Sequence, residues 1–426
     1  MNQLFNYLMI VFFIVAIFWT FYLRFPQFRL RKELKKINQD QKQSAYQTFL
    51  VSLATHIGTG NLIGVTTGLI IGGPGVIFWM WIFAFFSSSL ALVENTYAQV
   101  FKEKIDGENR GGASYYIKSG LDNRLLSIIF LSSLFLTNTI FFPPLQVNTI
   151  VMASNEIFGL NITIIGLLLF LSLSLIVFRG TKKIVKASEK IVPFMAISYT
   201  VIVLFLILID YQSIPYVIKL IIMGAFKAES FNLGFLITVM TLGIKRSLFS
   251  NEAGLGTTPS ISAMSDVAKP TDQGYFQMLG VFVDTLLMCT ITGIFILQRI
   301  EDFSNFTSSD IFTVIFVREF GKFGYLISFG FLFIFAFASL IGQYYLGESN
   351  ALFIIKEIKV SSKMVIFIYR IIFSIGIIIG IYYSTARILS LIDFGLIALG
   401  FTNIWVLYKL EKSIKLLIRK RKDGII

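Results

Sequence analysis

A short polar stretch, Thr55-His56-Ile57-Gly58-Thr59-Gly60-Asn61, interrupts an otherwise apolar segment. The apolar runs on either side, 46–53 and 62–71, are each too short to cross a bilayer, which takes roughly 20 residues. Together they predict one membrane-spanning helix that is broken near its middle. Unwound backbone at membrane depth is tolerated only inside protein or beside a polar cavity. The break would therefore present free amides and carbonyls to a guest, and it predicts a binding site.

A second interruption, from Phe249 to Pro259, lies in a later apolar run. The segments 46–210 and 231–408 are of similar length, and we expect each to hold five spans and to begin with its broken one. Because five is odd, the two segments would cross the membrane in opposite directions. Such inverted repeats with discontinuous helices are typical of secondary transporters, which bind substrate near the midplane.

The composition supports a polytopic membrane protein. Of the 426 residues, 55% are hydrophobic and only 14% are charged, and the mean hydropathy is +0.77. Cys289 is the only cysteine, which excludes a disulfide framework and a metal site of several thiolates. The net charge of +13 suggests nucleic acid at first sight. The placement of the basic residues instead indicates membrane topology.

Eleven hydrophobic spans are expected, with boundaries uncertain by several residues. They lie near 5–22, 48–71, 75–98, 125–154, 161–178, 191–209, 231–255, 273–298, 324–349, 364–383 and 388–408. With the N-terminus outside, 30 of the 37 Lys and Arg residues fall on the inner side, where we count Lys245 and Arg246. This bias predicts a plasma-membrane protein whose C-terminus is cytoplasmic.

The expected fold is all-α, and the chain divides into five parts. Residues 1–45 form an extra N-terminal span and a basic cytoplasmic loop, without a cleavable signal peptide, since the basic residues follow the span. The first repeat (46–210), an extracellular connection (211–230) and the second repeat (231–408) come next. A basic tail (409–426) would face anionic lipid, and we expect no nucleic-acid partner. The oligomeric state is left open.

Other classes of function fit less well. No Walker A sequence is present, so ATP is not expected to supply the energy. No arrangement of nucleophile and base or of metal ligands predicts an enzyme. A channel would need a continuous polar pore, whereas the polar residues gather at two breaks. An amino-acid sensor that binds without transporting stays open as an alternative.

An ordered set of motifs between about 45 and 350 resembles the alanine or glycine:cation symporter family, within the amino acid–polyamine–organocation group. The set comprises Gly58-Thr59-Gly60-Asn61-Leu62-Ile63-Gly64-Val65, Gly72-Gly73-Pro74-Gly75, Phe78-Trp79-Met80-Trp81, Gly111-Gly112, Tyr115-Tyr116-Ile117, Gln146, Asn148, Leu248-Phe249-Ser250-Asn251-Glu252-Ala253-Gly254, Asp284-Thr285 and Gly347-Glu348. The resemblance implies a leucine-transporter-like fold of five plus five helices after one extra helix. It also implies import of small neutral amino acids, driven by sodium or by protons, without an organic cofactor.

The resemblance also implies a substrate site at the two breaks. Backbone amides of Thr59 and Gly60 would bind the substrate carboxylate at a positive helix end. The ammonium would meet carbonyls near Phe249 and Ser250, with Gln146 as a polar partner and the Phe249 ring as a cap. The complete expected set is His56, Gly58, Thr59, Gly60, Asn61, Gln146, Phe249, Ser250, Asn251 and Gln343.

A sodium site follows from the same resemblance. Carbonyls of Ala54, Ile57 and Ala336 and the hydroxyl of Ser339 are the expected ligands. Family members often have two hydroxyl residues in sequence here, whereas Ala338 precedes Ser339. Alanine and glycine are the foremost expected substrates.

Gln343 stands where family members commonly have Trp, so the pocket would be roomier and more polar. This difference keeps glutamine or serine open as substrates. His56 either couples protons or has a hydrogen-bonded structural role.

Three intramembrane acids call for partners. We expect Glu252 to pair with a helix end or with Lys245 or Arg246. Asp284 would be protonated or paired with a distant residue, and Glu94 would be a gate or a helix-end charge. The amphipathic stretches 214–226 and 309–320 are expected to be lids over the site or interfacial helices, with the second the better gate.

Overall fold

The computed structural model of the chain describes residues 2–37, 39–105, 107–178, 180–226, 233–303, 306–358, 361–414 and 417. Its α-helices are α1 (Asn2–Tyr22), α2 (Leu30–Lys35), α3 (Gln39–His56), α4 (Val65–Gly72), α5 (Gly75–Val100), α6 (Ala113–Gly120), α7 (Arg124–Leu136), α8 (Pro143–Phe158), α9 (Ile162–Val177), α10 (Thr181–Ile209), α11 (Ile214–Ala225), α12 (Leu233–Asn251), α13 (Pro259–Ser262), α14 (Pro270–Val281), α15 (Thr290–Leu297), α16 (Ser308–Phe320), α17 (Phe323–Ile358), α18 (Ser362–Tyr382) and α19 (Thr385–Lys409). The strands are β1 (Glu103–Ile105) and β2 (Glu108–Arg110).

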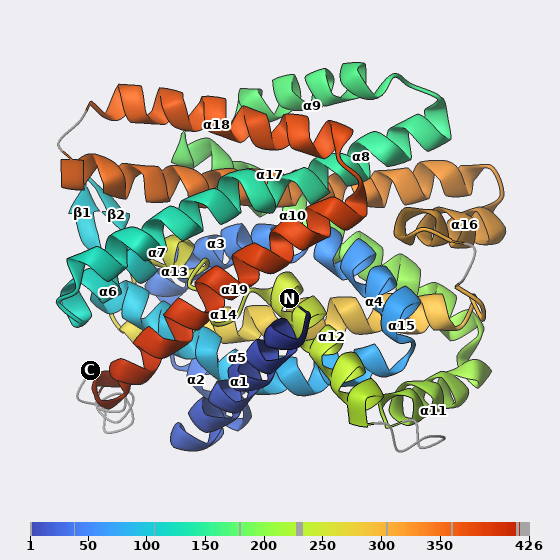
Figure 1. Cartoon of the computed structure of the whole chain (residues 1–426), viewed down its shortest axis with the longest axis horizontal. Helices are drawn as coiled ribbons and strands as arrows, with labels where there is room; N and C mark the ends of the chain where they lie inside the picture. The colour runs from blue at the N-terminus through green and yellow to red at the C-terminus, as the bar shows by residue number, and fades with distance from the viewer. Residues whose placement is uncertain are drawn as a thin grey trace.

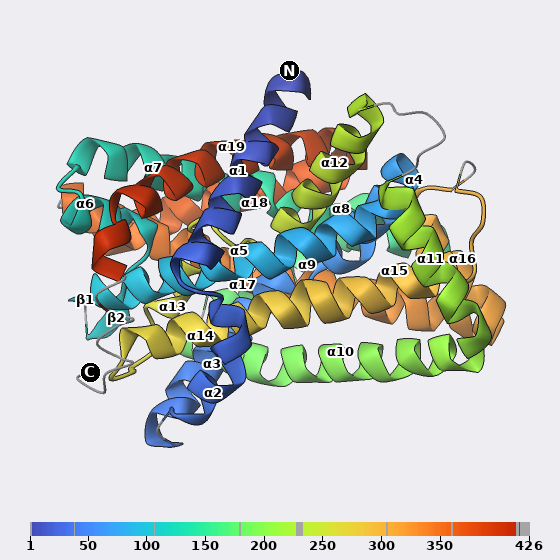
Figure 2. The same cartoon turned by 90° about the horizontal axis from the view of Figure 1, so that it is seen from below.

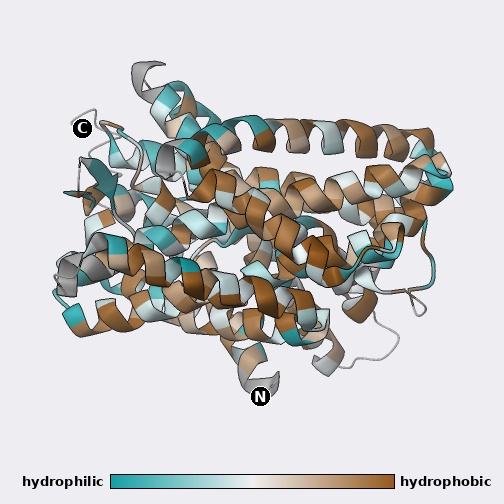
Figure 3. Ribbon diagram, turned by 90° about the horizontal axis from the view of Figure 1, so that it is seen from above, coloured by the Kyte–Doolittle hydropathy of each residue, from teal (hydrophilic) through white to brown (hydrophobic). Residues whose placement is uncertain are grey.

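Most of the long helices run along the longest axis of the molecule (Figure 1). The short helices α11 and α16 lie at one end of this axis, and the β1–β2 hairpin lies at the other end (Figure 2). We call these the α16 end and the hairpin end. Residues on the helices are largely hydrophobic, whereas hydrophilic residues gather near the hairpin end and in the loops (Figure 3). Large apolar side chains such as Leu175, Phe205 and Leu208 are more than 60% exposed, as a surface that faces lipid requires.

The structure confirms a nearly all-helical, multi-pass membrane protein. Among the described residues, eight helical segments are long and apolar enough to span a bilayer, and the bent pair α3 and α4 makes a ninth. All eleven predicted segments fall on helices. The α9 helix is only 16 residues long, and α12 ends at the second interruption after 19 residues. The count of eleven spans therefore stays a prediction.

Some elements differ from the expectation in length or type. The α10 helix begins at Thr181, well before the predicted span at 191, because the basic residues ahead of the apolar run are also helical. The β1 and β2 strands pair antiparallel, with Glu103 opposite Arg110, where the sequence predicted only a loop. Both amphipathic stretches form helices, α11 and α16. The basic tail beyond 417 lies outside the described residues.

Helix starts follow local sequence signals. Asn161 precedes α9, and its side chain accepts a hydrogen bond from the amide of Thr163 at 2.9 Å. Thr307 and Asp310 form a capping box at the start of α16, in which each side chain accepts from the other residue's amide. These caps fix where α9 and α16 begin.

Both predicted helix breaks are present. The segments Gln43–His56 and Gly60–Gly72 are bent by 48° across the first break, and Gly60–Gly64 adopts π-helical geometry. The second break separates α12 from α13. Gly254 and Gly256 have φ values of 89° and 76° there, in a region that only glycine adopts readily. Glu252 is also left-handed, at a φ of 52°, which is uncommon for a residue with a side chain.

Candidate functional site

The two breaks touch each other. A β-carbon at Gly60 would lie 3.3 Å from the Cα of Ser250 and 3.5 Å from the Phe249 ring. A β-carbon at Gly58 would overlap the hydroxyl of Ser339 on α17. Both glycines therefore permit an approach that a larger residue would block. The break of α3 thus lies against α12 on one side and α17 on the other.

Side chains of the first break are paired with neighbouring groups. The Thr59 hydroxyl donates to Gln146 Oε1 at 2.7 Å, and the Thr59 amide lies 3.4 Å from the same oxygen. The Gly58 amide donates to Asn61 Oδ1 at 2.9 Å. Thr59, Asn61 and Gln146 are all buried. The structure thus brings Gln146 of α8 to Thr59 of the first break, and its predicted role as a partner of the substrate ammonium stays a prediction. A carboxylate that bound the Thr59 amide would displace Gln146.

Asp284 finds its partners far away in the sequence. Asn61 Nδ2 donates to Asp284 Oδ1 at 2.7 Å, and the Thr285 hydroxyl donates to Oδ2 at 2.8 Å. Asn61 and Asp284 are 223 residues apart and both are fully buried. The Cys289 sulfur lies 3.3 Å from both Asn61 Nδ2 and the Ser250 hydroxyl. Asp284 therefore joins the two breaks to the segment between α14 and α15.

The Asn251 side chain makes hydrogen bonds on both sides of the start of the second break. Its Nδ2 donates to the hydroxyls of Ser247 and Thr285, both at 3.0 Å, and its Oδ1 accepts from the Ala253 amide at 3.0 Å. All three bonds are to protein groups. Asn251 was predicted to bind substrate, and the structure gives it these internal partners.

Glu94 of α5 satisfies the unwound backbone of the second break. Its carboxylate accepts from the amides of Gly254 at 3.0 Å and Gly256 at 2.9 Å, and from Asn403 Nδ2 at 2.8 Å. Asn403 Nδ2 also donates to the Gly254 carbonyl at 2.9 Å. The sequence indicated an intramembrane acid at position 94 but did not indicate Asn403. The Gly-rich break itself indicated that polar partners must lie nearby, because its unwound amides need hydrogen-bond acceptors.

The predicted cation ligands lie around the first break. Ser339 donates to the carbonyl of Thr55 at 3.4 Å, and Thr55 was not in the predicted set. Gly342, one turn further along α17, packs against Ala54 and Thr55. The remaining predicted ligands, Ile57 and Ala336, are fully buried. The backbone of α3 and the hydroxyl of α17 thus come together, and that these groups bind a cation stays a prediction.

Several buried polar atoms near the breaks have no hydrogen-bond partner among the described residues. They include both ring nitrogens of His56 and the Oε1 atom of Gln343. A hydrogen-bonded structural role for His56 is therefore not seen. Lys245 does not pair with Glu252, because it pairs with Asp393 at 3.1 Å. One oxygen of Glu252 also has no partner within the described part of the chain.

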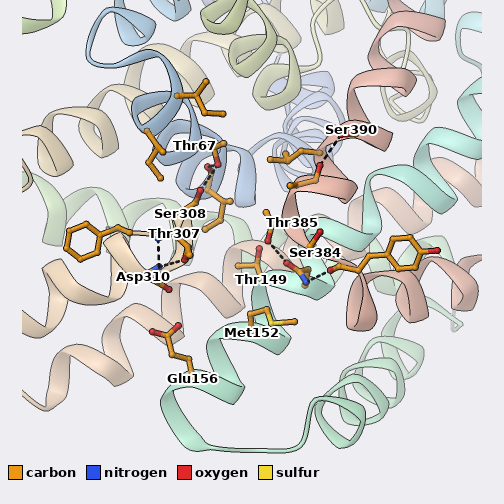
Figure 4. A pocket seen from close by; sticks show the side chains of 18 of the residues that line it. Thr67, Thr149, Met152, Glu156, Thr307, Ser308, Asp310, Ser384, Thr385 and Ser390 are labelled. Carbon is orange, nitrogen blue, oxygen red and sulfur yellow. Dashed lines mark hydrogen bonds between the residues drawn. The ribbon is translucent and has the colours of Figure 1, made fainter. Parts of the chain in front are cut away.

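A cavity of about 930 Å³ lies between the breaks and the α16 end. It is lined by α4, α8, α12, the start of α16 and the turn between α18 and α19 (Figure 4). None of the predicted substrate-binding residues lines it. Arg246 and Thr149 do, and they are three residues from Phe249 and Gln146 along α12 and α8. The cavity therefore begins about one helical turn from the predicted site.

The position of Arg246 bears on the charge count. We count Lys245 and Arg246 on the inner side of the membrane, although the predicted span 231–255 includes both. Both lie within α12, and Arg246 lines the cavity on the side of the α16 end. Residues inside a helix carry less weight in the count than residues in loops, so the orientation stays a prediction.

The chain matches known proteins over nearly its whole length. The model of the sodium:alanine symporter family matches residues 1–423. The probable sodium/glutamine symporter GlnT of Bacillus subtilis (strain 168) is 34% identical, over 96% of the chain and 87% of the relative. The amino-acid carrier protein AlsT of the same organism is 33% identical, over 99% of the chain and 91% of the relative. The sodium/proton-dependent alanine carrier protein of Bacillus sp. (strain PS3) is 27% identical, over 90% and 88%.

Proposed function

Because this chain belongs to the sodium:alanine symporter family, we propose that it imports a small neutral amino acid together with sodium across the cell membrane. Alanine or glycine is the proposed substrate. Sodium and the amino acid bind from outside, the outer gate closes, and the inner parts of the broken helices then open to the cytoplasm. The protein is a transporter and not an enzyme.

The observation that carries this proposal is the contact between two unwound segments inside the membrane-spanning bundle. Gly60 approaches Ser250 closely, and the Thr59 amide already has an oxygen partner in Gln146. A bound carboxylate would take the place of that oxygen at the Thr59 and Gly60 amides. The ammonium would face carbonyls at Phe249 and Ser250. Each charge of the substrate would then have a hydrogen-bond partner when it leaves water. Burial in a low-dielectric site requires such a partner.

The Phe249 ring would close the site toward the cavity. It lies against Gly60 and Gly64, and its centroid is 5.7 Å from that of Phe142. Arg246, which lines the cavity, precedes it on α12. A change in the ring's rotamer would open a path between the cavity and the breaks.

The topology that we propose is an inverted repeat of five plus five spans, with α1 as the extra span. The first repeat runs from α3 to α10 and the second from α12 to α19, and each begins at a broken helix. This arrangement is leucine-transporter-like. We place the N-terminus outside and the C-terminus in the cytoplasm, with the α16 end facing outward.

Sodium would bind between α3 and α17. Carbonyl oxygens of Ala54 and Ile57, the Ala336 carbonyl and the Ser339 hydroxyl are the proposed ligands. The contact between Ser339 and the Thr55 carbonyl supports this location, because it brings a hydroxyl to the backbone of the break. Sodium at this point would hold α3 against α17 and so couple ion binding to the position of the broken helix.

Glutamine or serine is the second candidate substrate, with protons in place of sodium as the alternative coupling ion. The buried Gln343 has an oxygen without a partner among the described residues, which would suit a polar side chain. One relative is named as a probable sodium/glutamine symporter and another as a sodium/proton-dependent alanine carrier. His56, which is buried beside the break, is the candidate group for proton coupling.

Uptake into liposomes tests these proposals. Purified protein is reconstituted, and uptake of radiolabelled alanine, glycine, serine and glutamine is measured under an inward sodium gradient, with and without a proton gradient. Sodium-dependent accumulation of alanine or glycine is expected. Accumulation of glutamine or serine instead would favour the second candidate. Saturable binding without uptake under either gradient would overturn transport and indicate a sensor.

A further inference from the structure

Arg246 is a buried cation without a close partner. Its side chain is 5% exposed, and its Nε atom has no hydrogen-bond partner in the described part of the chain. Its aliphatic stem packs against Gly68 of α4. The neighbouring acid, Asp393, already pairs with Lys245 at 3.1 Å. A guanidinium held out of bulk water without an anion is costly, so this charge is available to an anionic ligand.

Apart from apolar side chains and two asparagines, the rest of the cavity wall is acidic or hydroxylic. Asp393, Glu156 and Asp310 line the cavity together with Arg246, which is the one cation among the lining residues. Glu156 and Asp310 lie on the same side of the cavity and interact with each other (Figure 4). The Asn148 side chain is fully engaged with the α18–α19 turn. The cavity thus offers one site for a negative group at Arg246 and, at the Glu156–Asp310 pair, one for a positive group.

We propose that this cavity is an outer binding site, in which Arg246 binds the carboxylate of an amino acid before the substrate reaches the breaks. A guanidinium matches a carboxylate with two parallel hydrogen bonds. Glu156 and Asp310 stabilise the ammonium of the same molecule and repel ligands with a net negative charge. The site therefore takes zwitterions in preference to simple carboxylates such as acetate. The identity of the ligand rests on the proposed function.

Protection of an introduced thiol tests the proposal. Ser390 is exposed, lines the cavity and lies on the same face of α19 as Asp393, whereas the native Cys289 is buried. Reconstituted Ser390→Cys protein is treated with an anionic, membrane-impermeant thiol reagent, with and without alanine. Alanine at about ten times its dissociation constant should slow the modification about tenfold, whereas acetate should not.

Second variants separate the outer site from the breaks. The protection should persist with Gln146→Ala, which impairs the proposed site at the breaks. It should be lost with Arg246→Gln and be partly kept with Arg246→Lys, which retains the charge. Modification of Ser390→Cys without alanine should also slow in Arg246→Gln, because the local positive charge that attracts the anionic reagent is gone.

The outcomes distinguish the two proposals. Uptake of alanine by Ser390→Cys without protection would overturn the outer site and leave the transport function standing. Protection that survives Arg246→Gln, or that disappears with Gln146→Ala, would also overturn it, because closure over the breaks would then explain the effect. Absence of both uptake and alanine binding would contradict the proposed function itself.

Discussion

At the scale of single residues, the site depends on acids and amides that satisfy unwound backbone. Glu94 accepts two backbone amides of the second break, from residues about 160 positions away in the sequence. At the first break, Asp284 accepts a hydrogen bond from the Asn61 side chain, which in turn accepts one from the Gly58 amide. The sequence indicated these acids as intramembrane groups that need partners. It could not supply the partners, because contacts between distant segments depend on how the helices pack.

Replacement of Glu94 tests this role. Glu94→Gln exchanges one acceptor oxygen for a donor, so at least one of the Gly254 and Gly256 amides would face an NH₂ group. We expect a loss of about 1–3 kcal/mol in the free energy of unfolding and a large loss of uptake. Thermal unfolding in detergent and uptake in liposomes measure the two effects. Glu301→Gln, at an exposed position, is the control; equal behaviour of both variants would refute the role of Glu94.

Ser339 is the residue by which the sodium proposal can be tested. Ser339→Ala removes one proposed ligand and should raise the sodium concentration for half-maximal uptake on the order of tenfold, with little change in the maximal rate. Ser328→Ala is the matched control, because Ser328 is a buried hydroxyl on the same helix that bonds back to Tyr325. An unchanged sodium dependence in Ser339→Ala would exclude the proposed ligand set.

At the scale of elements, the two broken helices were predictable and their neighbours were only partly so. Glycine and asparagine inside apolar runs indicated both breaks, because these residues rarely occur together within a continuous membrane-spanning helix. The β1–β2 hairpin was missed, since strands of three residues leave no periodic signal. Arg246 falls inside the predicted span 231–255, but its place in the cavity wall depends on how the helices pack and could not be predicted.

The α16 helix is the element that we expect to act as the outer gate. Its first residue, Ser308, contacts Thr67 of α4, with the two hydroxyl oxygens 2.7 Å apart. A disulfide between Thr67→Cys and Ser308→Cys should therefore form with little movement of the backbone. Oxidised protein is expected to lose most of its uptake, because α4 and α16 can no longer separate.

Reduction supplies the internal control for this gate. Treatment with dithiothreitol should restore uptake in the double variant, and the Thr67→Cys variant alone should not respond to oxidant. Full uptake by protein that mass spectrometry shows to be cross-linked would mean that α16 does not move away from α4 during transport.

At the scale of the whole molecule, composition and hydropathy predicted the class of protein, and the resemblance predicted the family. The eleven predicted segments fall on helices because long apolar runs have few other stable structures in lipid. Orientation rests on a subtler signal, the distribution of Lys and Arg. Lys245 and Arg246 lie inside α12, so they do not count as loop residues. The prediction of orientation then rests on the basic residues of the loops near the hairpin end.

Cysteine labelling tests the orientation. Glu301 lies between α15 and α16, and Lys104 lies in β1 at the hairpin end; both are exposed. In intact cells, a membrane-impermeant maleimide should label Glu301→Cys and should label Lys104→Cys only after the membrane is permeabilised. The reason is that loops rich in Lys and Arg are retained in the cytoplasm. The reverse pattern would place the α16 end and its cavity inside the cell, so that the cavity with Arg246 would receive substrate on its way out rather than on its way in.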